Sequence, residues 1–239
     1  MLLTLESGLE AEELAAICET MESYLLRRSV CGMTNKNYNR VVMQLARKFK
    51  IEKPSGAATS AYLKELKGES AEWPTDGAFQ NAWNTREIYT TLSASRMAFI
   101  LTRLNDDFAS GKTETIKVED ALSIEHIMPQ GWIANWPLPN GARGIDDLRL
   151  WDALETDQNT RLTKDRNQLV QTIGNLTLVR QALNASLSNS AWLEKKRMLM
   201  EYSLLPINLP LQGVVMWDDQ MIITRSQLLF DRALKLWPR

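Results

Sequence analysis

The sequence predicts a mainly helical protein with a small β insert, an α+β fold. Apolar residues recur at helical spacing through most of the chain, and short β-branched or alternating runs are confined to a stretch near residues 115–200. The chain has 239 residues, of which 44% are hydrophobic and 24% charged. This length and composition suit a globular protein with one large domain or two small ones.

The first 112 residues have the pattern of successive helices. Residues 13–28 carry an apolar stripe at helical spacing and end in two arginines just before Gly32. The same reasoning places further helices over residues 35–49, 58–67 and 93–111, with another that begins near Asp76. We therefore expect a helical region over residues 1–112.

The pattern changes in the second region, residues 113–239. Residues 113–120 alternate enough for a short strand, and residues 121–127 could be its partner. A β-branched run over 173–179 follows a Gly-Asn turn. Helices are expected over 145–171, 187–202 and 217–237, the last two being amphipathic.

Several classes of protein are excluded or disfavoured by composition. No run approaches eighteen apolar residues, so no membrane span is expected, and the acidic N-terminus lacks the features of a signal peptide. Cys18 and Cys31 have no CxxC spacing, which disfavours a disulfide or metal role. A reducing cytoplasm fits this cysteine usage best.

Charge is distributed unevenly along the chain. The net charge of −1 argues against a nucleic-acid coat protein. Residues 160–197 nevertheless carry seven basic residues against two acidic ones, whereas the first thirty residues carry six glutamates against two arginines. A local basic region on a neutral protein suits an enzyme that contacts phosphates, although a solvated helix face is an equally good explanation.

His126 is the single histidine of the chain, and the acid Glu125 precedes it directly. A zinc site with two histidines is therefore excluded. Neighbouring residues on a strand point to opposite faces, so the strand must end or twist here if both side chains serve one site. Taken alone, His126 is more often a hydrogen-bonded core histidine than a catalytic one.

Combined motifs, however, resemble a known family. The stretch "EHIMPQ", followed by "IGNLTLVRQALNASLSNSAWLEKKR", is similar to the HNH, or ββα-metal, nucleases. More narrowly, these motifs and the entry "MESYLLRRSVCGMTNKNYN" resemble the C-terminal nuclease domain of GmrSD-type modification-dependent restriction enzymes and their relatives in phosphorothioate-sensing defence. The resemblance covers most of the chain. It implies a helical domain followed by a ββα-metal finger within residues 113–239.

The resemblance also implies a set of site residues. The catalytic pair would be His126, the general base that takes a proton from water, and Asn175, whose amide would tie the loop between the strands rather than act chemically. Glu125 and Asn184 would bind a divalent cation, Mg²⁺ or Mn²⁺; Asn184 could otherwise be a simple turn or cap residue. Where the family often has a second histidine, this chain has Gln171.

Three cations at residues 195–197, namely Lys195, Lys196 and Arg197, follow the expected metal-bearing segment and are candidates for phosphate contacts. A solvated helix face is an equally good explanation for them.

The function that the resemblance implies is a metal-dependent DNA endonuclease that nicks or cleaves phosphodiesters, as effector of a restriction or anti-phage defence system. The chain has no Walker-type glycine loop, so the nucleotide-hydrolysing, modification-sensing part would lie upstream or on a separate subunit. Two alternatives stay open: a catalytically inactive DNA- or protein-binding module of the same fold, and a toxin-like RNase.

Overall fold

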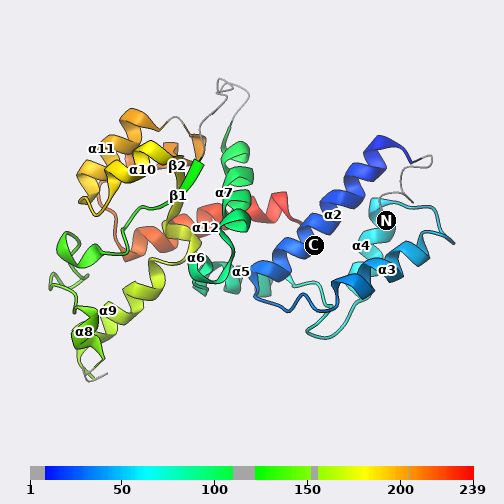
Figure 1. The fold of residues 1–239 in the computed structure, drawn as a ribbon, viewed down its shortest axis with the longest axis horizontal. Helices are drawn as coiled ribbons and strands as arrows, with labels where there is room; N and C mark the ends of the chain where they lie inside the picture. The colour runs from blue at the N-terminus through cyan, green and yellow to red at the C-terminus, as the bar shows by residue number, and fades with distance from the viewer. Residues whose placement is uncertain (1–8, 110–121, 152–155, 204) are drawn as a thin grey trace. The chain divides into compact units, whose positions relative to one another are not determined.

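Helices dominate the computed structural model, which describes residues 9–109, 122–151, 156–203 and 205–239 (Figure 1). The described α-helices are α2 (Ala11–Val30), α3 (Tyr38–Lys48), α4 (Gly56–Glu65), α5 (Asp76–Thr85), α6 (Ile88–Thr91), α7 (Ala94–Phe108), α8 (Asp147–Leu150), α9 (Gln158–Leu169), α10 (Gln181–Leu187), α11 (Trp192–Tyr202) and α12 (Asp219–Leu236). Short 3₁₀ helices are η1 (Trp132–Ala134), η2 (Ile173–Asn175) and η3 (Pro206–Gly213). The predicted mainly helical fold with a small β component is confirmed.

One antiparallel pair forms the described sheet. β1 (Leu122–His126) and β2 (Leu176–Arg180) align so that Leu122 faces Arg180 and His126 faces Leu176. The sequence suggests a strand over residues 113–120 as the partner of β1, but that segment lies outside the described residues. The partner that the structure gives is β2.

The order β1, β2, α10 brings two segments about fifty residues apart into one small layer. All of β2 except its last residue is buried, so this strand is covered on both faces, which explains its continuous apolar run. Helices α7 and α10 each pack against both strands (Figure 1). The sheet is thereby enclosed by helices, and the end of β1 lies within a packed environment.

The chain divides into two compact units. Unit 1 comprises the described residues of Met1–Trp83 together with Ala233–Arg239, and unit 2 is Asn84–Arg232. The sequence pattern suggests a boundary near residue 112 instead. The difference arises because α7 packs on β1 and β2, so a helix that the pattern assigns to the first region belongs with the sheet.

Unit 1 is built on helix packing. Its core includes Ile17 and Tyr24 from α2, Leu45 from α3 and Leu63 from α4, all completely buried. The helix expected to begin near Asp76 is α5, which begins at that residue. The preceding residue caps it, because the hydroxyl of Thr75 accepts a hydrogen bond from the amide of Ala78 at 3.2 Å.

The core of unit 2 lies beside the sheet and is rich in tryptophan. It includes Trp132, Trp136, Trp192 and Trp217, with Val179 from β2. Cys18 and Cys31 are free thiols. Among the described helices, none combines the length and apolar character that a bilayer crossing requires.

Candidate active site

Glu125 and His126 are the last two residues of β1, and as neighbours on a strand they point to opposite faces of it. Glu125 pairs with Thr177 and His126 with Leu176, and β1 ends at His126. Both side chains are buried, at 8% and 6% relative exposure. The strand therefore ends at the histidine, and the side chains of Glu125 and His126 contact different neighbours.

His126 lies between a tyrosine and a glutamine. Its ring packs edge-on against Tyr89 of α6, with 4.3 Å between ring centroids. Its Nε2 atom lies 3.2 Å from Oε1 of Gln171. The amide of Tyr89 donates to the carbonyl of Gln171 at 3.0 Å, so the two neighbours of the imidazole are themselves joined.

The contact with Gln171 selects one tautomer of His126. The Nε2 atom of Gln171 donates to Oε1 of Gln130 at 3.4 Å, which orients the amide so that its oxygen faces the ring. An amide oxygen only accepts, so Nε2 of His126 carries the proton. Nδ1 has no hydrogen-bond partner among the described residues. It is also not fully buried, unlike the side-chain nitrogen and oxygen atoms of the described residues that are both buried and without a partner. The lone pair of Nδ1 is therefore the one open to water.

Burial keeps the imidazole neutral. The pKa of His126 is lowered from 6.5 to about 4, mainly by burial and also by the nearby ammonium of Lys195, while the hydrogen bond that the ring donates to Gln171 opposes the shift. A neutral ring at working pH can accept a proton. A pKa of about 4 is nevertheless low for a general base, and an anionic phosphate beside the ring would raise it.

Glu125 faces a buried lysine. Nζ of Lys195, from α11, lies 2.5 Å from Oε1 of Glu125 and donates to the carbonyl of His126 at 2.7 Å. Burial raises the pKa of Glu125 and lowers that of Lys195, and for each group the partner's charge opposes the shift. Lys195 thus joins α11 to the last two residues of β1.

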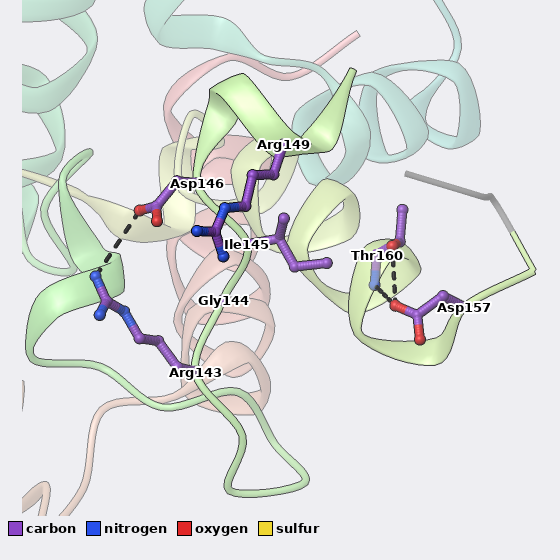
Figure 2. Close-up of a pocket in the computed structure, with 7 residues that line it drawn as sticks. All are labelled: Arg143, Gly144, Ile145, Asp146, Arg149, Asp157 and Thr160. Carbon is purple, nitrogen blue, oxygen red and sulfur yellow. Dashed lines mark hydrogen bonds and ion pairs between the residues drawn. The ribbon is translucent and has the colours of Figure 1, made fainter. Parts of the chain in front are cut away.

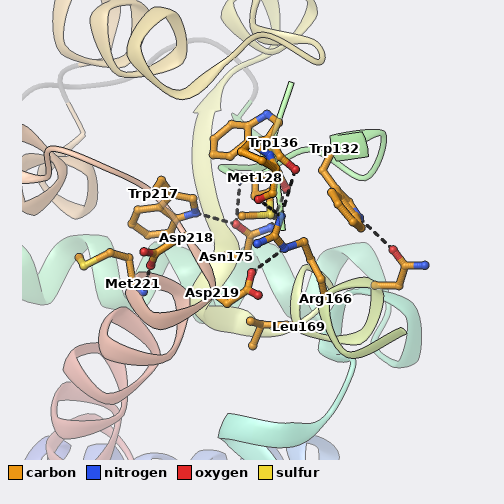
Figure 3. Close-up of polar contacts among 12 residues, drawn as sticks. Met128, Trp132, Trp136, Arg166, Leu169, Asn175, Trp217, Asp218, Asp219 and Met221 are labelled. Carbon is orange, nitrogen blue, oxygen red and sulfur yellow. Dashed lines mark hydrogen bonds and ion pairs between the residues drawn. The ribbon is translucent and has the colours of Figure 1, made fainter. Parts of the chain in front are cut away.

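Asn175 ties the segment after β1 to the turn before β2 (Figure 3). Its Nδ2 donates to the carbonyls of Met128 (2.8 Å) and Val170 (3.0 Å), and its Oδ1 accepts from the amide of Met128 (2.8 Å) and from Nε1 of Trp217 (3.1 Å). The residue is completely buried. All of these hydrogen bonds go to neighbouring parts of the fold. Asn175 therefore positions the segment after β1, and its side chain is not available to a substrate.

The same turn is pressed against α12. Nη1 of Arg225 donates to the carbonyls of Gly174 (2.9 Å) and Leu176 (2.7 Å). A methyl group on Gly174 would lie 2.2 Å from the carbonyl oxygen of Ile222, so residue 174 must be glycine for the turn to approach this closely. Burial lowers the pKa of Arg225 to about 9, which still leaves the guanidinium charged at neutral pH.

Arg166 fixes the tryptophans around this turn (Figure 3). Its guanidinium stacks over the ring of Trp132 at 4.8 Å and donates to Asp219 at 2.7 Å. It also donates to the carbonyls of Trp136 and Pro137. Arg166, one of the basic residues of the stretch 160–197, is therefore buried and bonded within the fold.

Asn184 lies on α10, which packs against β1. Its side chain is half-buried and has no hydrogen-bond partner among the described residues. Those residues contain no group of three or more His, Cys, Asp or Glu side chains able to hold a metal ion. One carboxylate and one amide oxygen nevertheless suit Mg²⁺, which keeps most of its water ligands. The donor types of Glu125 and Asn184 therefore fit the cation, although Glu125 already shares its charge with Lys195.

The three cations expected to contact phosphates have other partners. Lys195 is completely buried against Glu125, so it is not placed on the surface that such a contact needs, and this position corrects the expectation. Nζ of Lys196 donates to the carbonyl of Val214 at 2.8 Å. Arg197 is exposed but forms ion pairs with Glu194 and Glu201 on its own helix.

A separate open hollow of about 600 Å³ lies between α8 and the start of α9 (Figure 2). Its charged lining consists of Arg143, Asp146, Arg149 and Asp157. Asp157 caps α9 through the amide and hydroxyl of Thr160, and Asp146 faces Arg143 at 3.8 Å. None of the sequence-predicted site residues lines this hollow, so we do not assign the reaction to it.

Sequence reasoning missed two neighbours of the histidine and the role of one lysine. Gln171 carries a signal, because it stands where related sequences often have a histidine. Tyr89 carries none, since α6 lies 37 residues before His126 and reaches it only through tertiary packing. Lys195 follows a tryptophan in an amphipathic helix, and a buried lysine is rare enough that the pattern favours the surface.

Comparison with known proteins identifies a family. The model of a protein family described as GmrSD restriction endonucleases, C-terminal domain, matches residues 73–232. Neither the curated proteins nor the solved structures yielded a match. The matched range contains β1, β2, α10 and α11, and thus every residue discussed around His126. Because it covers more than half of the sequence, the chain belongs to the family of GmrSD restriction endonuclease C-terminal domains.

Proposed function

We propose that the protein is a metal-dependent DNA endonuclease of the HNH type, which nicks or cleaves phosphodiester bonds with His126 as general base. The observation that carries this proposal is the state of the one histidine. It ends β1 in a β1–β2–α10 order, its Nε2 is bound to Gln171, and its Nδ1 is neither hydrogen-bonded to a described residue nor fully enclosed. The family match supports DNA as the substrate.

The proposed chemistry follows from these positions. Nδ1 of His126 takes a proton from a water molecule, whose oxygen forms the new bond to phosphorus while the bond from phosphorus to the 3′-oxygen breaks. The products are a 5′-phosphate and a 3′-hydroxyl. Glu125 and Asn184 would hold Mg²⁺ or Mn²⁺, which supplies charge stabilisation at the phosphate and the leaving oxygen. Asn175 and Lys195 hold the segment that carries His126.

We further propose that the chain is an effector of a modification-dependent restriction or anti-phage defence system and works in the cytoplasm, where its DNA substrate is. An upstream domain or a separate subunit that hydrolyses nucleotides would sense the DNA modification. The family name supports a role in restriction.

Plasmid nicking tests the proposal. The purified wild type should convert supercoiled plasmid to the nicked form with Mg²⁺ or Mn²⁺ and not with EDTA, and His126→Ala should lose this conversion. Asn184→Ala should need more Mg²⁺ for half-maximal nicking, whereas Gln181→Ala, an exposed change on the same helix, should behave as wild type. Equal nicking by wild type and His126→Ala would refute the assignment.

One observation favours a second candidate, a catalytically inactive DNA-binding module of the same fold. His126 is 6% exposed and Glu125 is neutralised by Lys195, which is the arrangement of a satisfied core pair. This candidate predicts that the wild type and His126→Ala both bind DNA and that neither nicks it. Offering RNA and DNA side by side in the same assay separates the toxin-like RNase alternative from both.

A further inference from the structure

A basic segment lies in unit 1, ahead of the residues that the family model matches. Residues 36–53 carry six basic residues and one acidic residue, Glu52, so the segment has a net charge of five positive units (six minus one). The whole chain has a net charge of −1. A positive region of unit 1 is therefore formed by α3 (Figure 1) and the residues on either side of it. The basic residues are Lys36, Arg40, Arg47, Lys48, Lys50 and Lys53.

Helical spacing sorts α3 into two faces. Val41 and Leu45, four residues apart, are buried in the core of unit 1. Arg40 and Arg47, seven residues apart, are exposed and lie on the opposite face. Lys50 continues this exposed face beyond the end of the helix. We call these three residues, Arg40, Arg47 and Lys50, the α3 basic face.

The cations of this face are not neutralised by the protein. Among the described residues of this segment, Nζ of Lys48 forms an ion pair with Oε1 of Glu52 at 3.0 Å. The members of the α3 basic face have no acidic partner within reach among the described residues. Their charges are therefore available to an external anion. Lys196 and Arg197 are not available in the same way, because each already has a partner within its own unit.

We propose that the α3 basic face binds the phosphate backbone of duplex DNA. Arg40 and Arg47 are two helical turns apart, about 10.5 Å along the helix axis. Because phosphates repeat along each strand of the duplex, two guanidinium groups at this separation can contact different phosphates. Guanidinium groups suit phosphate oxygens because their planar donors can bind two oxygens at once. The face positions DNA without reading its sequence.

DNA fits this face better than an anionic membrane does. A helix that lies on a membrane buries its apolar face in the lipid. In α3 that face, Val41 and Leu45, is already buried in the core of unit 1. Of the exposed residues, Met43 and Ile51 offer isolated apolar contacts rather than a continuous stripe.

This inference rests on the proposed function for the choice of DNA, but its test does not depend on cleavage. Binding of the full chain to a fluorescently labelled duplex is measured by anisotropy in EDTA, over a series of salt concentrations. Arg40→Glu/Arg47→Glu is compared with Lys64→Glu/Lys67→Glu, which makes the same change in net charge at two exposed lysines elsewhere in unit 1. Thermal melting checks that both variants fold, as their exposed positions predict.

The α3 variant should raise Kd by about tenfold or more and reduce the slope of log K against log salt by about two, because each lost phosphate contact removes about 0.9. The control should bind nearly as wild type, and this outcome holds whether or not the protein is a nuclease. Equal binding by the α3 variant and the control overturns the inference, as does a wild type that does not bind DNA. Loss of binding to phosphatidylserine vesicles with unchanged DNA binding would identify a membrane as the partner instead.

Discussion

At the scale of single residues, the state of His126 is determined by one amide. Gln171 accepts from Nε2 and leaves Nδ1 with the lone pair, so the reactive nitrogen is chosen by a residue with no charge of its own. A neutral partner orients the ring and raises its pKa less than a carboxylate would. The imidazole is thus held ready but is weakly basic until a phosphate approaches.

Removing the amide oxygen should release this tautomer. In Gln171→Leu, we expect ¹⁵N spectra of the imidazole to change from the Nε2-protonated form to a mixture of both tautomers. Because the chain has one histidine, the signals need no assignment. Gln168→Leu, an exposed change on α9 that touches neither His126 nor Gln171 through its side chain, is the control. An unchanged mixture in wild type and Gln171→Leu would contradict the role of Gln171.

Burial of His126 should make stability depend on pH. The folded-state pKa of about 4 lies below the unfolded value of 6.5, so the unfolded chain binds the proton first as pH falls. Wild type should lose about 3 kcal/mol of unfolding free energy between pH 7 and pH 4 relative to His126→Asn. Urea unfolding in EDTA at several pH values measures the difference. A constant difference would mean that the ring is not buried in solution.

The sequence proposes the residues of the candidate site but not their contacts. His126 and Asn184 are proposed from motif order, and the hydrogen bonds of Asn175 are those that the proposed loop-tying role would use. Lys195 shows the limit, because its ammonium is buried by Glu125, 70 residues away in sequence. No local pattern contains that partner, and a lysine in an amphipathic helix is usually solvated.

At the scale of elements, the fold holds the site through the turn that enters β2. Asn175 is bonded to the segment after β1, Arg225 fixes the carbonyls on either side of it, and both lie in the interior. These contacts join three parts of the chain that are distant in sequence. The turn therefore links Arg225 of α12 to Met128, which follows the end of β1.

Truncating Asn175 should be costly. Asn175→Ala leaves the buried amide and carbonyl of Met128 and the indole of Trp217 without a partner, so we expect a loss of at least about 3 kcal/mol of unfolding free energy. Asn184→Ala, whose side chain has no hydrogen bond to lose, should change stability by less than about 1 kcal/mol. Denaturant unfolding compares the two. Similar losses would show that the network around residue 175 is not needed.

Sequence periodicity identified the elements better than their pairing. The run over 121–127, expected as the partner of residues 113–120, and the β-branched run over 173–179 mark the two strands. Apolar spacing marks the long helices, although within the range expected as one helix, 145–171, the described helices are α8 and α9. The pairing of β1 with β2 crosses about fifty residues. Alternation along one strand cannot specify which distant strand it meets, so this part of the fold needed the structure.

At the scale of the whole molecule, a net charge near zero conceals local charge. The sequence analysis located a basic stretch at residues 160–197, yet Arg166 and Lys195 from that stretch are buried in unit 2. The unneutralised cations of residues 36–53 lie in unit 1 instead. Counting charges along the sequence cannot separate these cases, because burial decides which charges reach a partner.

Separate surfaces for binding and chemistry predict a particular response to salt. Nicking by Arg40→Glu/Arg47→Glu should approach that of wild type at low salt and fall more steeply as salt rises, because binding becomes limiting. His126→Ala should be inactive at every salt concentration. A plasmid assay over a salt series distinguishes them. A parallel decline of wild type and the α3 variant would contradict the separation.

Gly174 has a consequence for mutational surveys. Even alanine would collide with the backbone of α12 at this position, so any replacement must displace the helix or the strand entry. In a library selected for activity, position 174 would be as intolerant as position 126, although its residue has no side chain to offer a substrate. Loss of function there would report a failure of assembly, and only a paired measurement of folding would tell it apart from a loss of chemistry.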